Sequence, residues 1–236
     1  MAGITDAEFL NKVIPLGFDV ATLGGYSLDA PTIEASKRIV ERGRNEFVFP
    51  VEETFSHIEN EIASIKRVHG SVKVSANVRS TTPQPIIDIG NIADLDIVEI
   101  NCHCRQEEIL SVGCGQEMLK RADLGDFISE VVDNVDCEVS VKIRGNVEGV
   151  DTLEIACLIE EAGADYLHVD AMKKGVFDAD YTLLKNICNN VQMKVIGNNS
   201  VNSELNAQKM IKTGVSGFSI ARGVISGNLS FNISNF

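Results

Sequence analysis

The feature that most constrains the fold is a regular alternation of short β-rich runs with amphipathic helical stretches from residue 18 onward. Strand followed by helix, repeated along a chain, is typical of a parallel sheet with helical crossovers. Runs such as Ile97-Val-Glu-Ile and Val195-Ile are almost continuously apolar, which indicates strands covered on both faces. The seven expected strands are Phe18–Leu23, Val72–Asn77, Ile97–Asn101, Glu138–Ile143, Tyr166–Asp170, Lys194–Gly197 and Gly217–Ile220.

The segment 152–162 illustrates the helical stretches between these strands. Gly163 is expected to end this helix, because glycine readily adopts the left-handed conformation that follows a helix terminus. Four apolar residues of this helix share one face: Leu153, Ile155, Ala156 and Ile159.

Seven strand–helix repeats, uninterrupted by a linker, predict a single (β/α)8 TIM-barrel domain over residues 1–236, with a doubly wound α/β sheet as the alternative.

The first strand of such a barrel is absent from the pattern. The segment Thr5-Asp-Ala-Glu-Phe is typical of a helix start, with Thr5 as N-cap and Glu8 completing a capping box. Either the first strand precedes Met1, or the barrel is open at this point.

Composition narrows the class of protein. The chain is 44% hydrophobic and 23% charged, as in a globular domain. It has no apolar run of 18 residues and no secretory leader, so we expect a cytoplasmic protein without a membrane partner. The net charge of −13 weakens attraction to phosphate backbones, so a nucleic-acid role requires a locally basic surface.

Basic residues follow most of the expected strands. In TIM barrels the chemistry lies at the carboxyl ends of the strands, so this placement predicts an anionic ligand there. The plainer alternative is that basic residues are common in loops. The residues concerned are Arg79, Arg105, Lys142, Arg144, Lys173, Lys174 and Arg222.

The last two strands lead into Ile196-Gly-Asn-Asn-Ser and Ser219-Ile-Ala-Arg-Gly-Val. Each segment is expected to place small residues at a helix N-terminus, where backbone N–H groups bind phosphate. The alternative is that glycine and asparagine are only turn residues here.

The densest chemistry is Asn101-Cys-His-Cys-Arg, which is followed by Cys114. Cys102, His103, Cys104 and Cys114 carry metal-binding atoms, but Cys-x-Cys is an uncommon spacing for zinc or an iron–sulfur cluster. A single reactive thiol beside Arg105, acting as a proton donor, is the favoured interpretation.

These motifs together resemble the tRNA-dihydrouridine synthases, which are FMN-dependent (β/α)8 barrels, and especially their short archaeal relatives. Met1-Ala-Gly-Ile-Thr-Asp resembles the family's Pro-Met-Ala-Gly-Val-Thr-Asp, and Asn101-Cys-His-Cys resembles Asn-x-Gly-Cys. Gly113-Cys-Gly-Gln-Glu-Met-Leu, Val141-Lys-Ile-Arg, Ile196-Gly-Asn-Asn and Ile220-Ala-Arg-Gly resemble further family motifs in the same order.

The resemblance implies FMN as cofactor, NADPH or NADH as electron donor, and tRNA as partner. It implies catalytic roles for Cys104 and Lys142 and substrate contacts for Asn101, Arg105, Arg144 and Lys173. His103, Arg105 and Asn199 depart from the family pattern, and Asp170 stands where the sixth strand of the family carries His. The implied cofactor-binding residues are Met1, Ala2, Asn77, Lys142, Asp170, Asn198, Asn199, Arg222 and Gly223.

Three functions remain open from the sequence. The first is reduction of the C5=C6 bond of uridine in tRNA, with Cys104 as proton donor. The second is an FMN barrel acting on a small pyrimidine or carboxylate, as in dihydroorotate dehydrogenases. The acidic composition and the absence of the family's C-terminal helical domain before Phe236 favour this second interpretation. The third is a non-catalytic barrel that binds a phosphorylated ligand.

Overall fold

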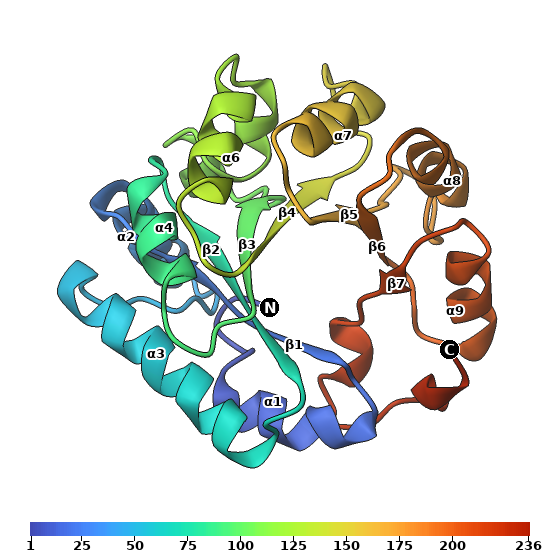
Figure 1. The fold of residues 1–236 in the computed structure, drawn as a ribbon, viewed down its shortest axis with the longest axis horizontal. Helices are drawn as coiled ribbons and strands as arrows, with labels where there is room; N and C mark the ends of the chain where they lie inside the picture. The colour runs from blue at the N-terminus through green and yellow to red at the C-terminus, as the bar shows by residue number, and fades with distance from the viewer.

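The computed structural model describes residues 1–236, and its centre is a curled parallel sheet surrounded by helices (Figure 1). Seven strands form the sheet, and each one pairs with the next along the chain. This confirms the predicted TIM-barrel fold, with seven strands instead of eight. The strands are β1 (Val20–Ser27), β2 (Lys73–Arg79), β3 (Ile97–Cys102), β4 (Glu138–Arg144), β5 (Tyr166–Asp170), β6 (Lys194–Asn198) and β7 (Gly217–Phe218).

The helices lie on the outer side of the sheet (Figure 1). Helix α7 begins and ends almost where the sequence predicts, and Gly163 follows it with φ +88°. No helix combines the length and the apolar character needed to cross a bilayer. The α-helices are α1 (Ala7–Val13), α2 (Ala30–Glu41), α3 (Val51–Val68), α4 (Gln84–Gly90), α5 (Glu107–Leu110), α6 (Leu124–Val132), α7 (Thr152–Glu161), α8 (Tyr181–Asn190) and α9 (Glu204–Ile211). The 3-10 turns are η1 (Ile14–Leu16), η2 (Gly115–Lys120), η3 (Arg222–Val224) and η4 (Ile233–Asn235).

The predicted capping box at the first helix is wrong. The N-cap of α1 is Asp6, whose carboxylate accepts a hydrogen bond from the Phe9 backbone N–H at 2.8 Å. The Thr5 hydroxyl instead donates to the Gly24 carbonyl oxygen on β1, 2.6 Å away. Thr5 therefore fastens the N-terminal segment to the sheet and is not available to cap the helix.

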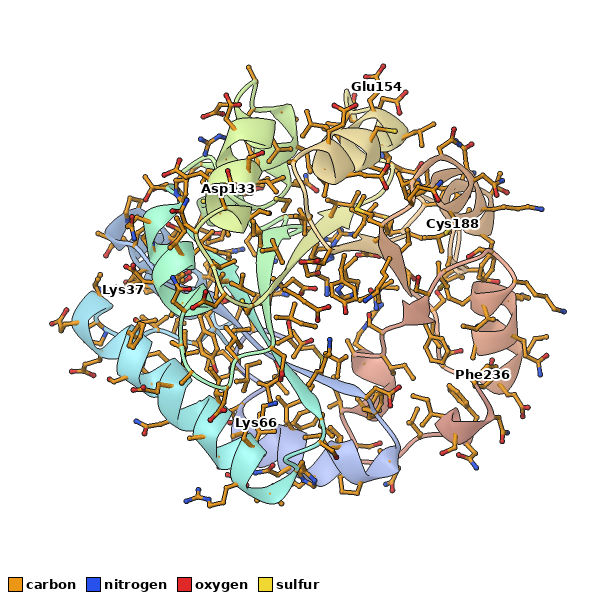
Figure 2. The ribbon with its side chains drawn as sticks, in the orientation of Figure 1. Lys37, Lys66, Asp133, Glu154, Cys188 and Phe236 are labelled. Carbon is orange, nitrogen blue, oxygen red and sulfur yellow. The ribbon has the colours of Figure 1, made fainter.

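The two faces of the strands differ in polarity. Outward-facing residues of β3 such as Val98, Ile100 and Cys102 are fully buried between the sheet and the surrounding helices. Every second residue, including Glu99 and Asn101, points into the curled sheet, where side chains fill the interior (Figure 2). The apolar core therefore lies outside the sheet, and the interior is polar.

The sheet is open between β1 and β7, which do not pair with one another. The segment after β7 reaches across this side of the molecule (Figure 1). Ile233 on η4 lies so close to Gly17 that a Cβ atom at position 17 would come within 2.8 Å of it. Phe236 packs edge-on against Phe218 of β7, with ring centroids 5.6 Å apart. The C-terminal segment therefore packs both against β7 and against the turn that precedes β1.

Candidate active site at the carboxyl ends of the strands

Polar inward-facing residues lie side by side because the strands pair in register. Asn77 on β2 lies beside Glu99 on β3, and Lys142 on β4 lies between Asn101 and His168. Parallel strands bring their carboxyl ends to one edge of the sheet, so these residues share one end of the barrel.

Glu99 is the centre of a buried hydrogen-bond network. Its carboxylate accepts hydrogen bonds from the Asn77 amide (2.7 Å) and the Ser140 hydroxyl (3.2 Å), and lies 2.7 Å from Nδ1 of His168. The other ring nitrogen of His168 lies 2.7 Å from the Ser219 hydroxyl. Burial alone would raise the pKa of Glu99, but the charges and hydrogen bonds of its neighbours lower it far below its ordinary value. Glu99 is therefore a fixed negative charge inside the barrel.

This network extends to the cysteine loop. The Asn101 amide donates to Asn77 Oδ1 at 2.8 Å, and Asn101 Oδ1 accepts hydrogen bonds from the backbone N–H groups of His103 and Cys104. The roles of Asn77 in cofactor binding and of Asn101 in substrate binding remain predictions. In the structure, Asn101 holds the loop that carries Cys104, and Asn77 supports Asn101.

A second contact supports the same loop from the other side. The Cys104 carbonyl oxygen accepts a hydrogen bond of 2.8 Å from the Gln116 N–H. Gly115 has φ +62°, and a Cβ atom there would lie 2.3 Å from the Cys104 oxygen. Only glycine permits this close approach. The thiol of half-buried Cys104 is left without a hydrogen-bond partner.

Three of the departures from the family pattern, His103, Asp170 and Asn199, meet in one cluster. His103 Nε2 lies 2.7 Å from the Asp170 carboxylate, and Arg144 Nη1 lies 3.1 Å from the same oxygen. The Asn199 amide donates to the other oxygen of Asp170 at 2.9 Å. Burial raises the pKa of Asp170, but the contacts with His103, Arg144 and Asn199 lower it below its ordinary value. Three predicted site residues, Arg144, Asp170 and Asn199, thus lie together with His103 in one cluster.

We expect this cluster to make the protein sensitive to acid. Burial lowers the pKa of His103 to about 4, although the hydrogen bond with Asp170 opposes the shift. Between the unperturbed value of 6.5 and about 4, the unfolded chain binds a proton that folded His103 does not. The free energy of unfolding therefore falls as the pH is lowered through this window. Urea unfolding near pH 7 and near pH 5 measures this loss.

The matched variant is His103→Asn, which removes the titrating ring but keeps a polar side chain. It should lose less stability than the wild type between the two pH values. The buried His168, whose pKa is also lowered, and the carboxylates leave a residual loss in the variant. Equal losses in both proteins would contradict the assignment of the acid sensitivity to His103.

The predicted cations at the mouth have different partners. The Nη2 atom of Arg79 donates to the Gly25 carbonyl oxygen and lies 2.6 Å from the buried Glu46 carboxylate. This atom is therefore not available to an external ligand. Lys173 pairs with Asp180 at 3.3 Å. The side chains of four further cations make no hydrogen bond or ion pair within the chain: half-buried Lys142 and exposed Arg105, Lys174 and Arg222.

The two predicted phosphate loops differ from one another. The loop after β6 leads into helix α9, whose N-cap is Ser203, and Asn199 and Ser200 have positive φ values of 104° and 56°. The loop after β7 leads only into the 3-10 turn η3, which begins at Arg222 and contains Gly223, both exposed. The expected second α-helix is therefore replaced by one short turn. The Asn198 amide donates hydrogen bonds to the carbonyl and hydroxyl oxygens of Ser219, and these bonds hold the two loops together.

The sulfur atoms do not gather at one point. Cys102 faces the outer core, with its sulfur 3.9 Å from that of Met118, and Cys114 donates to the Ser80 carbonyl oxygen. Burial raises the pKa of the Cys114 thiol to about 12. Of these three cysteines, only Cys104 lies on the loop that directly follows β3 at the mouth of the barrel.

Met1 and Ala2 are half-buried at the inner side of β1. Thr5 forms an antiparallel bridge with Gly24, and the Met1 amino group donates to the Gly24 carbonyl oxygen at 3.0 Å. Figure 1 shows the N-terminus near the middle of the curled sheet. The predicted cofactor residues Met1 and Ala2 are thus placed close to the interior.

Sequence reasoning missed Glu99, Ser140 and His168 as parts of the site. The missed signal is a polar residue at every second position within strands that are otherwise apolar. That alternation marks the inward face.

Comparison with known proteins decides the family. Residues 68–229 match the family model described as dihydrouridine synthase. The chain belongs to the dihydrouridine synthase family. The match includes β2 through β7 and therefore the network around Glu99, the Cys104 loop and the two loops after β6 and β7.

Relatives agree with this assignment. An uncharacterized protein of Methanocaldococcus jannaschii is 38% identical over 98% of this chain and 89% of its own length. tRNA-dihydrouridine synthase B of Shewanella oneidensis is 30% identical over 54% of this chain and 42% of that enzyme.

Solved structures share the fold at low sequence identity. 2,3-Dimethylmalate lyase matches with a TM-score of 0.59 and 12% identity over 92% of this chain and 72% of that one. N-acetylmannosamine-6-phosphate 2-epimerase from Clostridium perfringens matches with a TM-score of 0.52 and 13% identity over 87% of this chain and 85% of that one. At these identities the similarity concerns the fold alone.

Proposed function

We propose that this member of the dihydrouridine synthase family is an FMN-dependent oxidoreductase that reduces the C5=C6 bond of uridine in tRNA, with NADPH or NADH as the electron donor. The observation that carries the proposal is the Cys104 thiol, which has no hydrogen-bond partner and lies on a loop that Asn101 holds at the mouth of the barrel. This loop belongs to the part of the chain that matches the dihydrouridine synthase family.

The polar groups at the mouth of the barrel fit both the ring and the phosphate of a bound FMN. Half-buried Lys142 has no partner within the chain, and Arg79 Nε is buried without a hydrogen-bond acceptor. Lys142 is well placed to stabilise an electron-rich ring, and exposed Arg222 lies on the loop suited to a phosphate. Met1, Ala2, Asn198, Asn199 and Gly223 line the same end, while Asn77 and Asp170 support it through their hydrogen bonds.

FMN, when bound, supplies the hydride that the reduction requires. Cys104 Sγ donates the proton that completes reduction of the carbon–carbon double bond. Asn101 and Gly115 fix the position of the loop that carries this thiol. Arg144, held by Asp170 at the end of β4, and exposed Arg105 and Lys173 on the loops after β3 and β5 lie at the end of the barrel that a polynucleotide would approach first.

The test has two stages. The purified protein is first titrated with FMN and its visible absorption recorded, and flavin-type bands that bleach with NADPH or NADH are expected. Transcribed, unmodified tRNA is then added and dihydrouridine measured. A protein that does not bind FMN would refute the proposal, and reduction of free uracil or orotate in place of tRNA would favour a small-molecule enzyme.

A further inference from the structure

Charge is distributed very unevenly along this acidic chain. The whole chain has 21 Lys and Arg residues against 34 Asp and Glu residues. From Tyr181 to Phe236 there are five Lys and Arg residues and a single acidic residue, Glu204. The last quarter of the molecule is therefore basic, although the protein as a whole repels polyanions.

Two helices of this basic part lie side by side at one flank of the barrel, where Figure 1 labels α8 and α9. A hollow of about 320 Å³ lies between them, and Lys185, Lys209 and Lys212 line it. Lys185 and Lys212 are exposed and have no acidic partner. We call these three lysines and their hollow the basic wall.

The loop after β5 connects the mouth of the barrel to the basic wall. Asp178 in this loop accepts hydrogen bonds from the Tyr181 hydroxyl at 2.7 Å and from Lys209 at 3.0 Å. The Phe177 carbonyl oxygen accepts a hydrogen bond of 2.8 Å from the Ser200 hydroxyl. The loop is thus fastened to α8, to α9 and to the loop after β6.

The side chains at the tip of this fastened loop point outward. Phe177 is fully exposed, and Val176 is half exposed. Lys173 and Lys174 precede them and are exposed as well. An exposed aromatic ring among cations, on a loop held beside the site, is the arrangement by which proteins stack unpaired bases while binding phosphates.

We propose that the basic wall and the loop Lys173–Asp178 form the RNA-docking face of this protein, with phosphates on the lysines and an unpaired base stacked on Phe177. The inference rests on the proposed function, in which tRNA is the substrate. It adds the surface that binds the RNA and identifies Phe177 as the residue on which a base next to the target uridine stacks.

Phe177→Ala tests the stacking. Removal of the aromatic ring on which a base stacks should weaken binding of tRNA about 5- to 150-fold, measured by fluorescence anisotropy. FMN binding should not change, because Phe177 lies outside the mouth network. The matched control is Phe55→Ala, which removes an exposed phenylalanine on α3 and should leave the affinity unchanged.

A direct readout is available because the chain contains no tryptophan. Phe177→Trp should retain tRNA affinity, and its fluorescence should be quenched when tRNA is added. Phe55→Trp should show no quenching. Phe177→Leu, which keeps an apolar side chain without a ring, should bind as poorly as Phe177→Ala.

The lysines are tested by the dependence of affinity on salt. The double variant Lys185→Ala/Lys212→Ala should lower the slope of log affinity against log salt by about 0.7 to 0.9 for each phosphate that the lysines no longer neutralise. The control double variant Lys37→Ala/Lys120→Ala removes two exposed lysines of α2 and η2, outside the basic wall, and should keep the wild-type slope.

The outcomes separate this inference from the proposed function. If the wild-type protein neither binds nor reduces tRNA, the proposed function fails. If it reduces tRNA while the Phe177 and lysine variants bind like the wild type, the docking face is wrong and the function stands. Unchanged binding by Phe177→Ala alone would overturn the stacking contact.

Discussion

Replacement of Cys104 by alanine is expected to lower the rate of dihydrouridine formation about 10²- to 10⁴-fold, the range for loss of a general acid. The thiol makes no hydrogen bond within the chain, and the loop is held by its backbone groups through Asn101 and Gln116. The substitution should therefore leave the fold and the flavin spectrum intact. Single-turnover reduction of tRNA by the FMN-loaded, reduced protein measures the effect on chemistry.

Cys157→Ala provides the matched control, because this half-buried cysteine lies on α7, away from the mouth. It should retain the wild-type rate. Cys104→Ser should remain slow, since a hydroxyl is a much weaker acid than a thiol. A Cys104→Ala protein as fast as the wild type would eliminate Cys104 as the proton donor.

Replacement of Arg79 by methionine is expected to lower the free energy of unfolding by about 3 to 5 kcal/mol, because it leaves the Glu46 carboxylate buried without its partner. The two side chains are 1% and 2% exposed, so water cannot take the place of the guanidinium. The comparison uses urea unfolding without added flavin.

Two further variants make this prediction specific. Arg42→Met breaks the surface pair with Glu108 and should cost less than about 1 kcal/mol, since Arg42 is 56% exposed. The double variant Arg79→Met/Glu46→Leu removes both buried charges and should be more stable than Arg79→Met alone. If Arg79→Met and Arg42→Met were equally mild, the Arg79–Glu46 pair would not be the buried anchor that the structure describes.

Elements with a strong local pattern were predictable from the sequence. The strand Tyr166–Asp170 matches β5 at both ends, and α7 ends just before the expected glycine. In both cases the local pattern of apolar residues agrees with the final structure, and Gly163 also marks the end of the helix. No distant contact is therefore needed to set where these elements begin and end.

Features decided by distant contacts were not predictable. Thr5 and Asp6 are both good N-caps, and the choice of Asp6 depends on the bond from Thr5 to Gly24 on β1. Arg79 was predicted to face an anionic ligand, because the sequence does not reveal that Glu46, 33 residues earlier, lies against it. The pairing of His103 with Asp170, 67 residues apart, has the same origin.

The site itself was predictable in part. The position of Cys104, Lys142 and the two loops after β6 and β7 follows from the rule that chemistry lies at the carboxyl ends of barrel strands. Which amides remain available to a ligand does not follow from that rule. Asn77, Asn101 and Asn198 use their donors within the network, and only the three-dimensional register shows it.

The polar interior also restricts how this protein can change during evolution. Asn77, Glu99, His168 and Ser219 form one chain of contacts in which each side chain completes the bonding of the next. A single apolar substitution leaves a neighbour without its partner, whereas coordinated replacement of a pair does not. These positions should therefore vary together among relatives, and an engineer who alters the specificity of the barrel will have to exchange them in pairs.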